Sequence, residues 1–120
     1  MTGFGFLGHL KEMLGDSFSA VIDSEKIPRL PMSLEYAGEF YLTAAAQRNR
    51  NHLGDFVEFQ GVSFEMEELL FDPQTSGGLL ISLPEEDAKA AAAKMEAEGI
   101  CCGIVGRITR EETQKILVKA

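Results

Sequence analysis

The stretch "LLFDPQTSGGLLISLP", residues 69–84, places a proline turn and two adjacent glycines between two apolar runs. Asp72 and Pro73 favour a turn that ends the first run. Gly77 and Gly78 can adopt positive φ and let another group come close. The run at 78–84 is continuously apolar, which predicts a buried strand in the centre of a sheet. The stretch is therefore a turn that sets the fold, and its polar residues leave open a second role at a ligand site.

Helical spacing organises the chain before this stretch. Thr2 is a candidate cap for a helix whose apolar positions run to Leu14, and Gly15 is its stop. Residues 18–23 favour a strand, and the two prolines that follow favour an irregular loop. Residues 33–53 are helical in pattern, with Ser33 as cap, Gly54 as stop and a break near Gly38 or Thr43.

The remaining segments alternate between strand and helix patterns. Residues 55–59 predict a half-buried strand, and Ser63 caps a short helix that ends at the quoted turn. A helix over 85–98 begins after Pro84 and stops at Gly99. Residues 100–109 and 115–120 predict two strands joined as a hairpin by the turn at 110–114. This order predicts a layered α+β fold, in one domain spanning residues 1–120.

The net charge of −8 argues against a nucleic-acid partner, because such binding depends on clustered Lys and Arg. Cys101 and Cys102, the only cysteines, predict neither a disulfide framework nor a metal site, which favours a reducing cytoplasmic location. No apolar run approaches the roughly 20 residues of a membrane helix, so no membrane partner is expected. The composition indicates an ordinary globular protein.

For each of three weaker motifs, a structural role is a better interpretation than a role in binding or catalysis. "GFGFLG" at 3–8 matches a dinucleotide-binding pattern, but that pattern needs a strand before the glycines, so close helix packing is the better interpretation. His9 and His52 have no ligand partner at metal spacing, which favours packing or exposure. "QRNRN" at 47–51 is the densest basic spot; it could meet a phosphate, although a solvated helix end is commoner. We expect no catalytic residue and no metal ligand in this chain.

Two motifs together resemble one family. "TGFGFLGHL" at 2–10 and "LLFDPQTSGGLLISLP" at 69–84, with "RNR" at 48–50 between them, are similar to the C-terminal domain of the selenophosphate synthetases (selenide, water dikinases). The resemblance spans nearly the whole chain. It implies an α/β/α domain with a mixed sheet, of the aminoimidazole-ribonucleotide-synthetase-like superfamily.

The resemblance also implies an activity for the larger enzyme. Such enzymes use Mg²⁺, ATP, selenide and water to make selenophosphate, AMP and phosphate, and we expect a homodimer. Their reactive Cys or selenocysteine and most metal ligands belong to an N-terminal ATP-binding domain, which would be the partner of this chain. The implied nucleotide-site positions in this sequence are Thr2, Gly3, Thr75, Ser76, Gly77 and Gly78. Neither Mg²⁺ nor ATP is expected to bind tightly to this chain alone.

The sequence departs from the family pattern at two places. The family motif reads Asp-x-Thr-Gly-Phe-Gly, with the Asp as a metal ligand, whereas Met1 holds the x position here and the Asp is absent. Relatives often carry Gly-Gly-Ser/Thr where this chain has alanines at 44–46. The first departure indicates a fragment that supports catalysis only within the larger enzyme.

Two other interpretations stay open from the sequence. One is a free-standing, non-catalytic interaction domain. The other is the corresponding domain of a related ATP-dependent enzyme, such as a thiamine-phosphate kinase or a hydrogenase-maturation factor. The fragment hypothesis adds that an apolar surface, including part of Phe4, Phe6 or Leu7, is exposed and promotes self-association.

Overall fold

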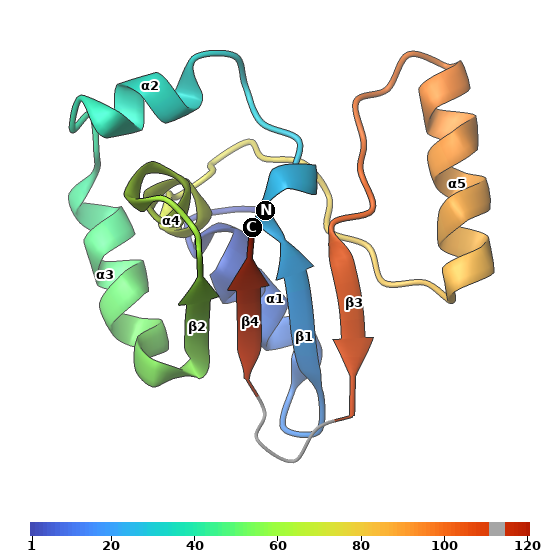
Figure 1. Ribbon diagram of the computed structural model, residues 1–120, viewed down its shortest axis with the longest axis horizontal. Coiled ribbons are helices and arrows are strands. Elements are labelled where there is room, and N and C mark those ends of the chain that lie inside the picture. The colour runs from blue at the N-terminus through green and yellow to red at the C-terminus, as the bar shows by residue number, and fades with distance from the viewer. Residues whose placement is uncertain (111–114) are drawn as a thin grey trace.

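A four-stranded mixed sheet forms the centre of the protein. The computed structural model describes residues 1–110 and 115–120. The strands are β1 (Ser19–Asp23), β2 (Val57–Gln60), β3 (Gly106–Thr109) and β4 (Ile116–Lys119), in the order β2-β4-β1-β3. β4 runs parallel to both β1 and β2, and β1 pairs with β3 in antiparallel register (Figure 1). The predicted α+β class and mixed sheet are confirmed.

Five α-helices and two short 3₁₀ turns lie around this sheet in the described part of the chain. The α-helices are α1 (Gly5–Leu14), α2 (Ser33–Gly38), α3 (Ala44–Leu53), α4 (Phe64–Phe71) and α5 (Glu85–Ala97), and the 3₁₀ turns are Ser24–Lys26 and Gly54–Phe56. The predicted break near Gly38 or Thr43 is present: α2 ends at Gly38, and the Thr43 hydroxyl accepts from the Ala46 N–H and caps α3. The predicted Ser63 cap of α4 is also confirmed.

The hydrophobic core joins α1, α3 and α4 to one face of the sheet. Leu7 and Leu14 of α1 and Ile116 and Val118 of β4 are almost fully buried. Their spacing in sequence follows helical and strand periods, so each element turns one apolar side inward. Figure 1 shows α1 behind β4 and β1, and α5 apart from the others beside β3. Every residue of α5 is exposed or half-buried.

The prediction of a central strand at 78–84 is wrong. These residues have no regular secondary structure before α5, and Leu79, Ile81 and Leu83 are exposed while Leu80 packs against the core. The start of the run is hydrogen-bonded to Met1 instead of to a strand. An apolar run reports a preference for burial, but it does not say which neighbour is available to pair.

The predicted C-terminal hairpin is also wrong. β1 lies between β3 and β4 and pairs with both, so the last two strands are not neighbours. Only Gly106–Thr109 of the predicted strand at 100–109 is regular, and residues 100–105 cross from α5 to the sheet. Of the predicted turn at 110–114, residues 111–114 lie outside the described residues.

Two predicted helix caps do not form. The residue before α1 is Phe4, and the Thr2 hydroxyl contacts His9 instead of the helix amides. The residue before α2 is Met32, in the left-handed conformation, and Ser33 is the first residue of that helix. The predicted stops at Gly15, Gly54 and Gly99 are confirmed by their positive φ values.

Exposed aromatic side chains gather where α2 meets α4. We define the aromatic patch as Tyr36, Phe40, Tyr41 and Phe64, all at least 46% exposed. The rings of Tyr36 and Tyr41 are 5.7 Å apart, and those of Phe40 and Phe64 are 6.0 Å apart. The sequence prediction named other side chains, of which Phe4 is exposed but Phe6 and Leu7 are buried.

We predict that the chain self-associates through the aromatic patch at high concentration, because contiguous apolar surface promotes association. Phe40 has φ +65°, which asparagine tolerates better than phenylalanine, so Phe40→Asn removes the ring without a folding cost. Light scattering should show a smaller mean mass for this variant. Leu30→Asn, at a leucine outside the patch that is 79% exposed, is the control and should change the mass less. A wild-type chain that stays monomeric would contradict the prediction.

Candidate functional site

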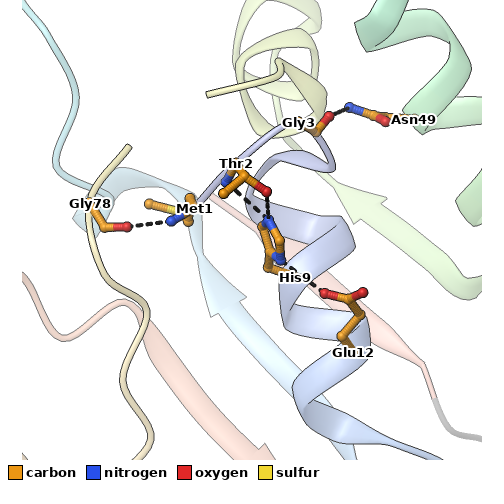
Figure 2. Close-up of polar contacts among 7 residues, drawn as sticks. All are labelled: Met1, Thr2, Gly3, His9, Glu12, Asn49 and Gly78. Atoms are coloured by element: carbon orange, nitrogen blue, oxygen red, sulfur yellow. Dashed lines mark hydrogen bonds and ion pairs between the residues drawn. The ribbon is translucent and has the colours of Figure 1, made fainter. Parts of the chain in front are cut away.

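The two motifs of the sequence analysis meet in the fold, although residues 11–68 lie between them. The terminal ammonium group of Met1 donates to the Gly78 carbonyl at 2.7 Å, and the Gly77 N–H donates to the Met1 carbonyl at 3.3 Å. One residue on, the Gln74 N–H donates to the Thr2 carbonyl at 3.1 Å. Figure 2 shows the contact between Met1 and Gly78. We call residues 1–3 and 74–78 together the paired segments.

Asn49 and Gly5 hold the paired segments against α4. The side-chain amide of Asn49 donates to the Gly3 carbonyl at 2.9 Å and to the Phe71 carbonyl at 2.8 Å. One side chain of α3 therefore satisfies two backbone acceptors from distant parts of the chain. Gly5 has φ +72°, and a Cβ there would lie 2.9 Å from the Asp72 carbonyl oxygen, so only glycine allows this approach.

The six predicted nucleotide-site residues lie on the paired segments. Thr75 and Ser76 form the exposed turn of the loop, and Thr2, Gly3 and Gly78 are exposed beside it. Gly77 is half-buried, and a Cβ on it would lie 2.9 Å from Gln74 Cβ and 3.0 Å from Met1 Cβ. The residues thus share a surface that the backbone builds and that keeps its hydroxyl groups in contact with solvent.

The sequence prediction missed His9 and Asn49 as parts of this site. His9 Nε2 contacts both the N–H and the hydroxyl of Thr2, and His9 Nδ1 contacts Glu12 (Figure 2). Thr2 precedes α1, and His9 lies within that helix, seven residues further along the chain. The spacing rules for metal ligands and helix caps do not include a contact at this separation. Asn49 lies in the "RNR" stretch, for which the sequence prediction considered the positive charges of Arg48 and Arg50 and not the amide between them.

Arg50, which belongs to the basic spot at 47–51, forms ion pairs with residues of α4. Its guanidinium donates to Glu67 at 3.0 Å and to Glu68, and it lies over the Phe71 ring at 4.7 Å from the centroid. Burial by itself lowers the pKa of Arg50, but the hydrogen bonds and charges of Glu67 and Glu68 outweigh it and raise the pKa above the usual value. The hypothesis that the basic spot meets phosphate is therefore not supported at Arg50, which ties α3 to α4.

The surroundings of Asp72 disfavour the ionised form of its side chain. Burial raises the pKa of Asp72 above its usual value, and the hydrogen bond from the Thr43 hydroxyl offsets only part of that rise. The carboxylate also follows the C-terminus of α4, where a negative charge opposes the helix dipole. The ionised form therefore weakens the folded state.

We predict that Asp72→Asn is more stable than the wild type at neutral pH, because asparagine still accepts from Thr43 without carrying charge. A raised pKa means that the folded state favours the protonated acid. The stabilisation that the protonated Asp72 gives to the folded state is therefore fully present below the unfolded pKa and is lost as pH rises through the folded pKa. The difference in Tm should therefore shrink as the pH falls from about 7 towards the ordinary aspartate pKa of 3.8. A difference in Tm that is constant over this range would contradict the assignment.

The described residues offer little for holding a metal or enclosing a ligand. Among them, no group of three His, Cys, Asp or Glu side chains is arranged to bind a metal ion. A groove of about 300 Å³ lies between α1 and α3, with Phe4, Glu12 and Asn49 on its walls, and none of the six predicted residues lines it. A nucleotide at the paired segments would thus need further walls and metal ligands from elsewhere. None of the helices in the described ranges has the length and apolarity of a membrane span.

Comparison with known proteins gives relatives along nearly the whole chain. A protein from Agathobacter rectalis named selenide, water dikinase is 51% identical over 119 residues, which cover 98% of this chain and 35% of the relative. Proteins of the same name from Pelobacter propionicus and Desulfitobacterium hafniense are 43% and 38% identical, over 99% of this chain and 35% of each relative. The chain thus spans about a third of the length of the relatives it matches.

The family comparison agrees with these relatives. The sequence pattern of the AIR synthase related proteins, C-terminal domain, matches residues 1–119. The match includes both paired segments, the helices between them and the final strand. The chain therefore belongs to the family of AIR synthase related protein C-terminal domains.

Proposed function

We propose that this chain acts as the C-terminal domain of a selenide, water dikinase, an enzyme that makes selenophosphate, AMP and phosphate from ATP, selenide and water. The relatives carry the name of that enzyme and are about three times as long as the matched region. The partner of the chain is then an N-terminal ATP-binding domain, in a homodimeric cytoplasmic enzyme. Mg²⁺ and ATP are bound by the complete enzyme and not by this chain alone.

The observation that carries the proposal is the joining of residues 1–3 to residues 74–78. Hydrogen bonds of Met1 and Thr2 with Gln74, Gly77 and Gly78 bring the beginning of the first motif against the loop of the second, and these are the motifs that resemble the dikinases. The result is an exposed surface of hydroxyl groups and glycines, which can accept the close approach of a phosphate chain. In the proposed enzyme this surface forms one wall of the nucleotide site, and the domain before it supplies the metal ligands and the reactive residue.

Mg²⁺ fits this division of roles. The described residues hold no metal-ligand cluster, and the family aspartate would precede Thr2 by two positions, beside the paired segments. When bound, Mg²⁺ would neutralise phosphate charge, and Met1, Thr2 and Gly3 are the residues of this chain that follow that position directly in sequence. In this proposal the residues of this chain form one wall beside the nucleotide, and the group transfer takes place on residues of the N-terminal domain.

A fusion enzyme tests the proposed function. It joins the part of the Agathobacter rectalis relative that precedes the matched 35% to this chain. We expect selenide-dependent formation of AMP from ATP by the fusion enzyme, and none by the same polypeptide ending at the junction or by this chain alone. A soluble, folded fusion enzyme without this activity would contradict the proposal and favour the non-catalytic interaction domain.

A separate assay tests which substrate the fusion enzyme uses. The fusion enzyme should form AMP with selenide but not phosphorylate thiamine phosphate. The names of the relatives favour selenide, and this assay separates the dikinase from other ATP-dependent enzymes of the superfamily.

A further inference from the structure

A hydroxyl, an imidazole and a carboxylate form a continuous hydrogen-bonded chain at the edge of the paired segments. Thr2 Oγ1 lies 2.8 Å from His9 Nε2, and His9 Nδ1 lies 2.9 Å from Glu12 Oε2 (Figure 2). The Thr2 N–H donates to the same Nε2 at 3.0 Å. His9 therefore touches Thr2 twice, through its backbone and through its side chain.

The contacts on the two ring nitrogens favour the same tautomer. A backbone N–H can only donate, so the contact with Thr2 requires that His9 Nε2 accepts and carries no proton. The ring proton of the neutral imidazole then lies on Nδ1, from which it is donated to Glu12. The Thr2 hydroxyl must likewise donate to Nε2, which leaves the lone pairs of Thr2 Oγ1 free to accept from another group.

The ring is held in place by its own helix. His9 and Glu12 are three residues apart on α1, so their side chains lie on the same face. The Phe4 ring meets the imidazole edge to face, with centroids 5.7 Å apart. The His9 side chain is only 22% exposed, whereas that of Glu12 is 61% exposed. Glu12 can therefore be changed at little cost in packing.

We propose that His9 is a positioning residue: in its Nδ1–H form, favoured by Glu12, it holds the Thr2 hydroxyl group in a fixed place on the surface that faces the nucleotide site. The positioned Thr2 lies on the paired segments, one residue from the Met1 backbone that pairs with Gly77 and Gly78. The chemical class of the ligand, a nucleoside triphosphate, rests on the proposed function. The geometry of His9, Glu12 and Thr2 does not.

The first experiment measures the tautomer in the 120-residue chain without any nucleotide. Nitrogen-15 NMR distinguishes the protonated from the unprotonated ring nitrogen, at a pH where His9 is neutral. We expect Nδ1–H in the wild type and in Glu12→Gln, whose amide oxygen still accepts from Nδ1. Glu12→Ala should shift the ring towards Nε2–H and change the Thr2 methyl signal. An Nε2–H wild type, or a tautomer indifferent to Glu12→Ala, would overturn the proposal.

The second experiment measures kinetics in the fusion enzyme. His9→Gln keeps an acceptor near the place of Nε2, and His9→Leu removes it. We expect His9→Leu to raise the KM for ATP about tenfold with little change in kcat, because a ground-state contact is lost, and His9→Gln to restore most of the affinity. A lower kcat at unchanged KM for His9→Leu would indicate loss of folded enzyme only, and would overturn the positioning role.

The two experiments separate the two proposals. If the 120-residue chain shows an Nδ1–H tautomer that depends on Glu12 and the fusion enzyme makes no AMP, the proposed function is contradicted and the positioning of Thr2 stays supported. An active wild-type fusion enzyme with an Nε2–H His9 would support the proposed function and overturn the positioning role.

Discussion

Gly5→Ala should lower the free energy of unfolding by about 3 kcal/mol, because the added methyl group is opposed both by close backbone atoms and by the left-handed conformation of the residue. An added Cβ would lie 2.9 Å from the Asp72 carbonyl oxygen and 3.0 Å from that of Phe71, both backbone atoms that cannot rotate away. The residue also has φ +72°, and the left-handed conformation costs an L-residue about 1–2 kcal/mol. Overpacking of a tight site adds about 1–3 kcal/mol.

Two other glycines separate these contributions. Gly61 has φ +68° and only an ordinary contact at 3.9 Å, so Gly61→Ala should show the cost of conformation alone, about 1–2 kcal/mol. Gly3 has a Cβ position with no described atom within 4 Å, so Gly3→Ala should change stability by less than about 0.5 kcal/mol. Urea unfolding of the three variants measures the series. Equal effects of Gly5→Ala and Gly3→Ala would show that α1 does not approach the 71–72 backbone as described.

Arg50→Met should lower the free energy of unfolding by about 2–3 kcal/mol. The Glu68 side chain is only 6% exposed, and Arg50 is its ion-pair partner. Removing one partner of a buried pair costs about 3–5 kcal/mol, because the other charge is left uncompensated. The Arg50 side chain is 29% exposed, so water can reach part of the site and the expected loss is smaller. Unfolding in urea near neutral pH measures it.

Two matched variants test the cause of this loss. Arg48→Met removes the same charge from an exposed position on the same helix and should be nearly neutral. The double variant Arg50→Met with Glu68→Leu should recover most of the lost stability, since an apolar pair can replace a buried ion pair at little cost. A double variant less stable than Arg50→Met alone would show that Glu68 contributes through packing and not through its charge.

Local signals in the sequence predicted much of the secondary structure, because they act within a few residues. Thr43 and Ser63 cap helices through their own side chains, and Gly15 and Gly54 end helices through positive φ. These devices need no information about the rest of the fold. The resemblance of the motifs then predicted that two distant segments belong to one site, and the hydrogen bonds of Met1 and Thr2 bring those segments together.

The partners of each strand could not be predicted in the same way. The apolar run at 78–84 and the two final strands showed a preference for burial or extension, but β1 occupies the place between β3 and β4. Strand order depends on contacts far apart in sequence, which periodicity does not encode. The contact of His9 with Thr2 was missed for a related reason, since a contact with a backbone N–H leaves no residue pattern.

The central claim is that residues 1–3 and 74–78 together form a wall of a nucleotide site. Hydrogen–deuterium exchange of the fusion enzyme, with and without ATP and Mg²⁺, tests it most directly. We expect ATP to slow amide exchange in residues 74–78 and in the segment around Thr2, and to leave α5, which lies apart beside β3, unchanged (Figure 1). Exchange in both paired segments that is unaltered by saturating ATP would contradict the claim.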